Sequence, residues 1–281
     1  MSAPKRKKPA WREWVESIAL AAVVVIVIRN FIVEPFRIPT GSMEPTLYGV
    51  KKECPVCHRS QFPYEESRCP LDGARLRTQH IGDRILVNKF IYGAKTPDRI
   101  PFTAILLPYL QLPALRGPRR GDIVVFHYPE DLKIDFVKRL AGLPGETLEI
   151  KGGKIWIDGQ PVTDPVFAKT YYYNQGDFGA AAQPIAIPKK GDRISLSPRS
   201  LPLYRQLLAN EGRAVAVRDG QVLVDGKPCA EYPAAMNHYF LLGDNSGNSK
   251  DSRFWGFVPE RNIVGNVFFV YWPPRRWGIP R

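Results

Sequence analysis

A long apolar run near the N-terminus is the feature that most limits how this chain can fold. Residues 14–33 read WVESIALAAVVVIVIRNFIV, and every side chain between residues 19 and 28 is apolar. As a helix, a run of this length spans the hydrocarbon core of a bilayer, with Trp14 at the near interface and Arg29 reaching toward the far one. The run therefore predicts one transmembrane anchor over residues 14–33.

Two other interpretations of this run are a cleaved signal peptide and a buried helix. A cleaved signal peptide requires a small-x-small site after its apolar core, but residues 29–35 read RNFIVEP and contain no such site. The buried helix of a soluble protein, behind a basic tail that keeps the chain in solution, stays open as an alternative.

The charges around the run predict its orientation. Residues 1–12 carry five Lys or Arg and no acidic residue. By the positive-inside rule, a basic tail of residues 1–13 stays in the cytoplasm and the chain after residue 33 lies outside, in a protein that crosses the inner membrane once. A second apolar segment, residues 100–115, contains three prolines and predicts an apolar loop or a membrane-touching surface rather than a second span.

Beyond the anchor, most of the chain has the pattern of short β-strands. Runs rich in β-branched and aromatic residues alternate with the turn sequences KGGK, DGQ and DGK, which predict tight hairpins. Residues 201–212 have a helical pattern that ends at Gly212. The expected fold class is mainly β: an antiparallel β core, residues 34–149 and 237–281, that carries an inserted β subdomain, residues 150–236, and follows one transmembrane helix.

Ser42 and Lys138 are the residues from which a reaction can be built. A serine hydroxyl attacks a carbonyl only when a base removes its proton, and lysine can replace histidine as that base. Lys138 lies in the apolar sequence FVKRLAGL. An exposed lysine is neutral in about one molecule in two thousand at pH 7, so burial would have to lower its pKa by roughly 3 units. A surface lysine, and a Ser-His-Asp triad built from distant positions, stay open as alternatives.

Four segments together resemble the successive signature blocks of type I signal peptidases, the bacterial leader peptidases with a Ser-Lys dyad. In the family's order they read SMEPTL, GDRILVNKFIYG, GDIVVFHYPEDLKIDFVKRLAGLPGE and GDNSGNSKDSRFWGFVPERNIVGNV. The resemblance implies a membrane-bound serine endopeptidase that cleaves N-terminal signal peptides from exported precursors after an Ala-x-Ala-like motif. It implies an extracytoplasmic catalytic β core and no cofactor for catalysis.

The resemblance also assigns roles to single residues. It makes Ser42 the nucleophile and Lys138 the general base. Ser249 matches the family's second serine, which orients the lysine through a hydrogen bond. Thr40 stands where a hydroxyl completes an oxyanion hole with the Ser42 amide, and such donors are worth about 3 kcal/mol each.

Further positions follow from the same resemblance. Asp251 and Arg253 match a structural acid and arginine beside the site. The shallow apolar subsites that admit alanine fall on Phe36, Ile38, Met43, Leu47 and Val137. Plain core packing stays open as the role of each of these five. The substrate is expected to bind in an extended form alongside an exposed strand.

Residues 50–80 depart from the family's pattern, because about thirty residues separate the first two blocks. Cys54-x-x-Cys57, eleven residues and then Cys69-Pro-Leu-Asp72 resemble a pair of zinc-ribbon knuckles. Three thiolates suit Zn²⁺, and Asp72 is the expected fourth ligand, with two histidines as alternatives, His58 and His80. The competing interpretations are a disulfide, including one between Cys69 and Cys229, a knuckle without metal, and a redox-active CxxC.

Two functional hypotheses follow. In the first, the partners are signal peptides of secreted preproteins, the lipid surface and the secretion translocon, with no nucleic acid. In the second, the net charge of +13 and the cysteines indicate a membrane-anchored zinc-ribbon binding protein without protease activity. The second hypothesis leaves the four signature blocks unexplained, and the cysteine-containing segment carries six basic residues against four acidic ones.

Overall fold

The computed structural model describes residues 10–60, 62, 63, 65–96, 110–176 and 184–280. Most of the basic tail, residues 1–9, and most of the proline-containing apolar segment, residues 100–109, lie outside the described residues.

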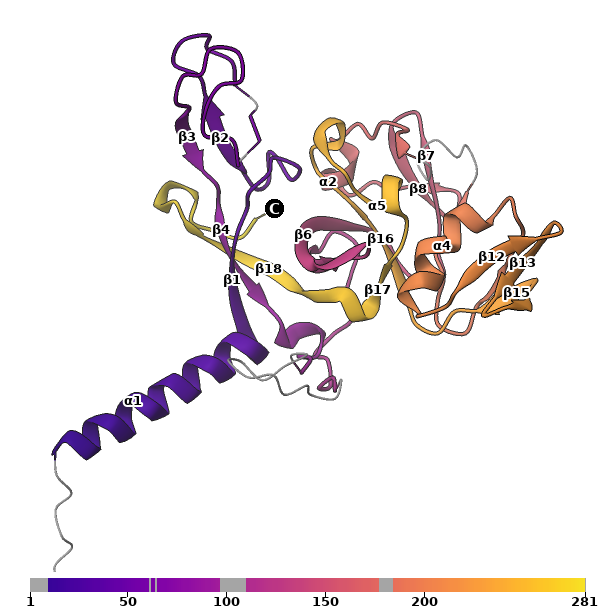
Figure 1. Ribbon diagram of the computed structural model, residues 1–281, viewed down its shortest axis with the longest axis horizontal. Helices are drawn as coiled ribbons and strands as arrows, with labels where there is room; N and C mark the ends of the chain where they lie inside the picture. Colours follow the sequence, from indigo (N-terminus) through magenta and orange to yellow (C-terminus); the bar gives the residue numbers. More distant parts are fainter. Residues whose placement is uncertain (1–9, 61, 64, 97–109, 177–183, 281) are drawn as a thin grey trace, which may run out of the picture.

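One helix stands apart from the rest of the chain. α1 (Ala10–Val27) continues into a π-helical turn, η1 (Ile28–Ile32), and points away from the β structure (Figure 1). Over Trp11–Ile32 its mean hydropathy is 2.2 and none of it is buried, and within the described chain it is the one helix long and apolar enough to cross a membrane. Helical structure ends one residue before the expected boundary because Val33 already pairs with Asn88 in a sheet.

A seven-stranded antiparallel sheet forms the centre of the molecule. Its strands come from both ends of the chain, and all neighbours run antiparallel. In spatial order they are β1 (Val33–Arg37), β4 (Arg84–Asn88), β18 (Ile263–Trp272), β5 (Ile123–Tyr128), β6 (Asp131–Gly142), β16 (His238–Leu242) and β17 (Val258–Pro259).

The central strand β5 shows why its first four residues, 123–126, are all apolar. Its alternate residues face two different apolar clusters: Val124 and Phe126 pack in one, and Ile123 and Val125 in the other. A strand that is covered on both faces needs apolar side chains at every position. The sheet is therefore the middle layer of a core, and polar groups inside it must be satisfied by partners within the protein.

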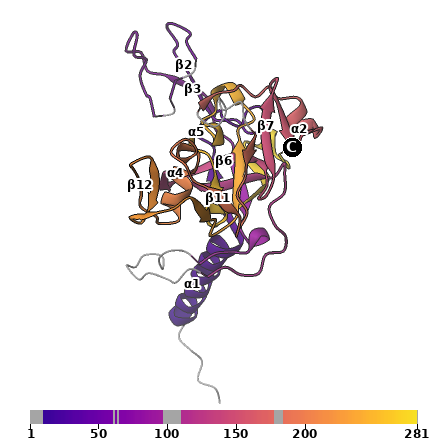
Figure 2. The same cartoon turned by 90° about the vertical axis from the view of Figure 1, so that its right-hand side faces the viewer.

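The chain between β6 and β16 forms three smaller sheets beside this core (Figures 1 and 2). They are β10-β7-β8-β9, β11-β15 and β12-β13-β14. Their bounds are β7 (Thr147–Lys151), β8 (Lys154–Ile157), β9 (Gln160–Pro161), β10 (Ile185–Ala186), β11 (Arg193–Ser195), β12 (Val215–Arg218), β13 (Gln221–Val224), β14 (Lys227–Pro228) and β15 (Glu231–Pro233).

The hairpins expected in this region are confirmed. The KGGK and DG turns join β7 to β8, β8 to β9, β12 to β13 and β13 to β14. In each of the DG turns the aspartate and the glycine both have positive φ, which is the backbone twist that a two-residue hairpin turn requires.

Short helices complete the described chain. The expected helix after residue 200 is present and ends two residues before Gly212. The helices are α2 (Pro165–Ala168), α4 (Leu201–Asn210), α5 (Ser252–Trp255), η2 (Phe90–Tyr92), η3 (Ser246–Asn248), η4 (Glu260–Asn262) and η5 (Pro274–Arg276). The prediction of a mainly β fold with one N-terminal apolar helix is confirmed.

A narrow arm projects from the sheet near the start of the chain (Figures 1 and 2). It consists of β2 (Val50–Glu53), β3 (Arg77–Ile81) and the loops between them, and it forms a two-stranded sheet of its own. The three cysteines of residues 50–80 lie on this arm, outside the seven-stranded sheet.

Candidate active site

Ser42 lies on a loop whose two ends are tied to the sheet. The loop leaves β1, and Asp83 closes its neck: the Asp83 carbonyl accepts from the Ile38 amide at 2.8 Å, and its carboxylate accepts from the Tyr48 amide at 2.8 Å. Gly49 is required at this neck, because a Cβ there would lie 2.3 Å from the carbonyl carbon of Thr40. The closed neck fixes where Ser42 sits relative to the sheet.

Lys138 reaches Ser42 from the middle of β6. Its Nζ donates a hydrogen bond to Ser42 Oγ at 2.7 Å and another to the Val137 carbonyl at 3.0 Å. The Lys138 side chain is 4% exposed, and its Nζ lies 5.3 Å from the centre of the Phe136 ring. The two residues are separated by 96 positions in the sequence, so their contact is a product of the tertiary fold.

The surroundings of Lys138 change its acidity. Burial lowers the pKa of Lys138 to about 8, against opposing contributions from the carboxylates of Asp251 and Asp244. With this pKa, about one lysine in ten is neutral at pH 7, compared with about one in two thousand for an exposed lysine. The burial that the proposed general base needs is therefore present.

Two buried arginines explain why the nearby carboxylates do not hold Lys138 in its charged form. Arg253 pairs with Asp251 through two hydrogen bonds of 2.8 and 2.9 Å, and neither side chain is exposed. Arg139 pairs with Asp244 in the same way, at 2.8 and 2.7 Å. Each carboxylate already has a bidentate cation, so its attraction for the ammonium of Lys138 is largely offset.

Asp251 also organises the backbone of the site. Its carboxylate accepts from the Gly243 amide at 3.0 Å and from the Arg253 amide at 3.2 Å, where it caps α5. Arg253 extends the network to the carbonyls of Tyr173 and Ser246 at 2.9 and 2.8 Å. These contacts agree with structural roles for both residues, which stay a prediction.

Ser249 is buried in the site, but it lacks the expected hydrogen bond to Lys138. It is 6% exposed, and its hydroxyl has no hydrogen-bond partner among the described residues. A Cβ on Gly243 would lie 2.1 Å from Ser249 Oγ and 2.6 Å from the Ser42 carbonyl oxygen, so Ser249 and the Ser42 segment approach the same glycine. Its role in orienting Lys138 stays a prediction.

Sequence reasoning did not single out Asp244, Arg139 and Asn245. Asn245 clamps the Ser42 segment: its amide donates to the Ser42 carbonyl at 3.0 Å and its side chain donates to the Gly41 carbonyl at 3.0 Å. All three residues lie inside the signature segments. Asp244 and Asn245 lie between Gly243 and Gly247, and this polar turn was the available signal for them. Arg139 offered no such signal.

Thr40 and the five apolar positions lie in different environments. Thr40 is exposed, two residues before Ser42. The apolar residues share one cluster under the Ser42 loop, in which three are closed off from solvent and two are partly exposed. The closed residues are Ile38, Met43 and Leu47, and the partly exposed ones are Phe36 and Val137.

A cleft opens beside the Ser42 loop. It has a volume of about 680 Å³, and its lining includes Thr46, Asn245, Tyr171 and Tyr173. The segment after α2 and the loop after β16 therefore line a hollow together with residues 44–46 of the Ser42 loop.

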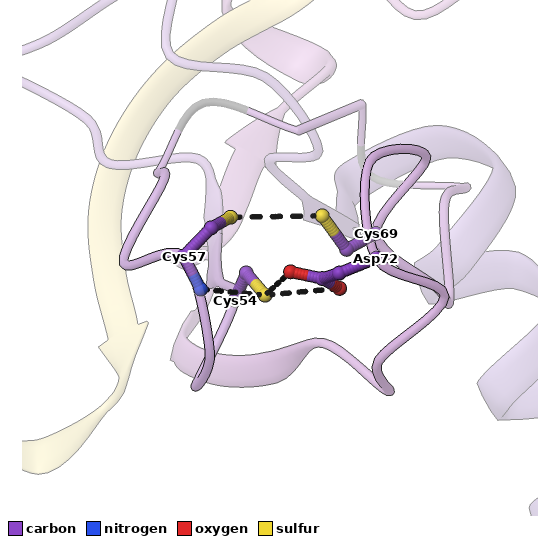
Figure 3. Close-up of side chains that lie close together, drawn as sticks. All are labelled: Cys54, Cys57, Cys69 and Asp72. Atoms are coloured by element: carbon purple, nitrogen blue, oxygen red, sulfur yellow. Dashed lines mark hydrogen bonds between the residues drawn. The ribbon is translucent and has the colours of Figure 1, made fainter.

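The arm brings together four side chains that could hold a metal. Figure 3 shows Cys54, Cys57, Cys69 and Asp72 converging from two turns. His58 Nδ1 lies 3.6 Å from a carboxylate oxygen of Glu53, and His80 Nδ1 is hydrogen-bonded to the Gly49 carbonyl at 3.0 Å. Neither histidine belongs to this group.

Comparisons with known proteins agree with this fold and these segments. A family described as "Signal peptidase, peptidase S26" matches residues 11–53, 73–190 and 233–272. The signal peptidase I of Pseudomonas aeruginosa is 30% identical, covering 98% of this chain and 78% of its own length. The signal peptidase I of Pseudomonas fluorescens is 30% identical, covering 95% and 75%. A probable signal peptidase I-1 of Synechocystis sp. is 27% identical, covering 95% and 85%.

These matches, together with the apolar helix and the antiparallel β fold, define a membrane-associated hydrolase. The chain belongs to the signal peptidase family, peptidase S26. It is a serine endopeptidase that acts on signal peptides, and its N-terminal helix fits a membrane anchor. The alternative of a zinc-ribbon binding protein without protease activity is set aside.

The contact at Gly243 leads to a first prediction. Gly243→Ala places a methyl group against Ser249 Oγ and the Ser42 carbonyl, so the Ser42 segment must move. A displacement of this kind is expected to lower kcat/KM for a signal-peptide substrate by about a hundredfold. Gly247→Ala is the matched control, because its nearest neighbour would be a Tyr173 ring carbon at 3.5 Å. Equal rates for the two variants would contradict the prediction.

The buried amine leads to a second prediction, about stability. Folding lowers the pKa of Lys138 from 10.5 to about 8, so between these pH values the unfolded chain binds a proton that the folded chain does not, and stability rises with pH. Lys138→Met is expected to be more stable by about 2 kcal/mol at pH 7 and to lack that rise.

Thermal denaturation in detergent between pH 7 and 10 measures both effects. Lys133→Met, an exposed position on the same strand, is the control and should keep the pH dependence of the wild type. A Lys138→Met protein that follows the wild-type curve would show that the amine carries no cost of burial.

Proposed function

We propose that Ser42 and Lys138 form the catalytic dyad of this signal peptidase, with Ser42 as the nucleophile and Lys138 as the general base. The observation that carries the proposal is the 2.7 Å hydrogen bond between Lys138 Nζ and Ser42 Oγ inside a buried site where the lysine pKa falls to about 8. A nucleophile and its base within hydrogen-bond reach are the arrangement that such catalysis requires.

The chemistry proceeds in two stages. Neutral Lys138 takes the proton of Ser42 Oγ as the oxygen attacks the scissile carbonyl, and the resulting ammonium then protonates the leaving amine. A water molecule, activated by the same lysine, hydrolyses the acyl-enzyme and frees Ser42. The Ser42 amide and the Thr40 hydroxyl are the proposed oxyanion donors, and Ser249 is the proposed hydrogen-bond partner that holds the lysine.

The substrate is the extended end of a signal peptide with an Ala-x-Ala-like motif. We place its small side chains against Phe36 and Val137, which are partly exposed, over a floor of Ile38, Met43 and Leu47. Since that floor is already packed, side chains larger than alanine would find no room. Main-chain hydrogen bonds to a strand edge would supply affinity for any extended peptide.

The anchor and an apolar surface would keep the enzyme at the membrane. The Lys89 amide donates to the Ile32 carbonyl at 2.9 Å, and Leu115 to the Ile91 carbonyl at 3.1 Å. These bonds bring three exposed leucines close to the end of the helix: Leu110, Leu112 and Leu115. Such a surface suits the interfacial region of a bilayer.

The successive segments of the chain are proposed to lie as follows relative to the membrane. The tail of residues 1–13 is cytoplasmic, residues 14–33 span the membrane once, and the catalytic core of residues 34–149 and 237–281 lies outside, beside the translocon. The insertions are residues 50–80 and 150–236. Ser42 follows the helix by ten residues, so it lies within about 35 Å of the helix end.

Processing of a precursor tests the dyad. Ser42→Ala should abolish cleavage of a purified precursor with an Ala-x-Ala motif, and Lys138→Ala should slow it by about 10²–10⁴-fold. Lys133→Ala, an exposed lysine on the same strand, should cleave like the wild type. The same precursor with Phe at the last position of the motif should resist the wild type. Wild-type rates in both dyad variants would overturn the assignment.

The pH dependence of the rate tests the base itself. The rate should rise with pH and level off above an apparent pKa near 8, since the neutral fraction of Lys138 grows in this range. Below that value kcat/KM should fall about tenfold per pH unit. A flat profile across this range would exclude a lysine of this pKa as the base.

A further inference from the structure

The tip of the arm contains two turns with the same internal geometry. In the first, the His58 amide donates to the Cys54 carbonyl at 3.0 Å; in the second, the Gly73 amide donates to the Cys69 carbonyl at 2.9 Å. The residue that closes each turn has positive φ, 55° at His58 and 71° at Gly73. The two turns are thus equivalent, fifteen residues apart, and Asp72 occupies the place of Cys57.

A second pair of hydrogen bonds repeats in the same register. The amide of Cys54 donates to the Arg59 carbonyl at 2.9 Å, and that of Cys69 donates to the Ala74 carbonyl at 2.8 Å. Two equivalent turns that face each other with their ligand-bearing ends are the arrangement of paired metal-binding knuckles.

Two pairs among the four ligand residues have separations close to those in a tetrahedral zinc site. All four lie within 4.8 Å of one another. Cys57 Sγ and Cys69 Sγ are 3.7 Å apart, and Cys54 Sγ lies 3.1 and 3.5 Å from the carboxylate oxygens of Asp72 (Figure 3). Zinc–sulfur bonds of about 2.3 Å in a tetrahedron place two sulfurs about 3.8 Å apart.

Neighbouring amides prepare two of these ligands. Val56 and Cys57 each donate a backbone N–H to Cys54 Sγ at 3.4 Å, which orients the sulfur within its turn. The Ala74 amide donates to one oxygen of Asp72 at 2.9 Å. That bond orients the carboxylate toward the sulfurs, as partners of metal ligands commonly do.

A disulfide does not account for the cluster. All four cysteines are free, and the 3.7 Å between Cys57 Sγ and Cys69 Sγ exceeds a disulfide bond of about 2.05 Å. Cys229 lies elsewhere and donates its thiol to the Glu231 carbonyl at 3.2 Å. The thiols are therefore spaced for a shared ion rather than for a bond.

The apolar cluster of the arm is too small to stabilise the arm without a covalent or metal cross-link. Among the described residues of the arm, its apolar cluster contains Cys54, Cys69 and Leu76, with Phe62 and Ala74 packed against it. So small a cluster rarely holds a structure together without a disulfide or a metal. The match to the signal peptidase family stops at residue 53 and resumes at residue 73, so the cluster lies mainly in a segment that this chain adds to the shared part.

We propose that Cys54, Cys57, Cys69 and Asp72 bind one Zn²⁺ ion, which joins the two turns and fixes the tip of the arm. Four protein ligands leave no open position, so the ion is structural and takes no part in peptide cleavage. The site stands independently of the dyad, since neither Ser42 nor Lys138 contributes to it.

Metal analysis of the full-length chain in detergent tests the proposal. The protein is reduced, mixed with equimolar Zn²⁺, desalted and assayed for bound zinc. The wild type, Ser42→Ala and the control Cys229→Ser should each retain about one ion per chain, and Cys54→Ser and Cys57→Ser should lose it. Absence of zinc from the wild type would overturn the proposal, as would equal zinc in the Cys57→Ser variant.

Variants of Asp72 distinguish a ligand from a residue that only shapes the turn. Asp72→Ala should bind Zn²⁺ more weakly in a competition with a chromogenic chelator, and Asp72→Cys should bind at least as tightly as the wild type. Unchanged affinity in Asp72→Ala would remove it from the ligand set and overturn the four-ligand site.

Hydrogen exchange provides a readout that does not depend on either variant. A chelator should increase amide exchange across residues 50–81 and leave β6 unaffected, because the neck of the Ser42 loop has hydrogen bonds of its own. Unchanged exchange in the arm, or a Cys57–Cys69 disulfide in protein isolated without reductant, would show that the ion does not join the turns.

Discussion

The chemistry proposed for this protein depends most on the burial of one amine, Lys138 Nζ, against one hydroxyl, Ser42 Oγ. Burial of a lysine favours its neutral form, and the neutral form is the one that can accept a proton. Two carboxylates nearby would reverse this effect if they were unpaired. Their arginine partners, Arg139 and Arg253, hold them in bidentate pairs, so the apolar surroundings decide the acidity of the lysine.

The seven-stranded sheet buries Lys138. β6 carries Lys138 between β5 and β16, and the chain after β16 returns with both carboxylates. The Ser42 loop is tied to Asp83 at its neck. Three segments that are distant in the sequence thus meet at one point because the sheet fixes the position of each.

Two parts of the chain outside the seven-stranded sheet, the arm and the three small sheets, leave this arrangement intact. The arm leaves the chain just beyond the neck of the Ser42 loop, and the three small sheets occupy the connection between β6 and β16. Loops between strands tolerate added chain when their ends stay close together. A zinc ion in the arm would likewise order the arm without adding any constraint to the sheet.

The sequence by itself determined the local features: the apolar helix, the DG hairpins and the spacing of the cysteines, because each depends on the geometry of a few consecutive residues. The signature segments also pointed to Ser42 and Lys138. Arg139 could not be told from a surface arginine, since its burial comes from strands far away in the chain. Tertiary structure alone decided the 2.7 Å contact across 96 residues and the lowered pKa of Lys138, because desolvation and charge pairing depend on everything that packs around a group.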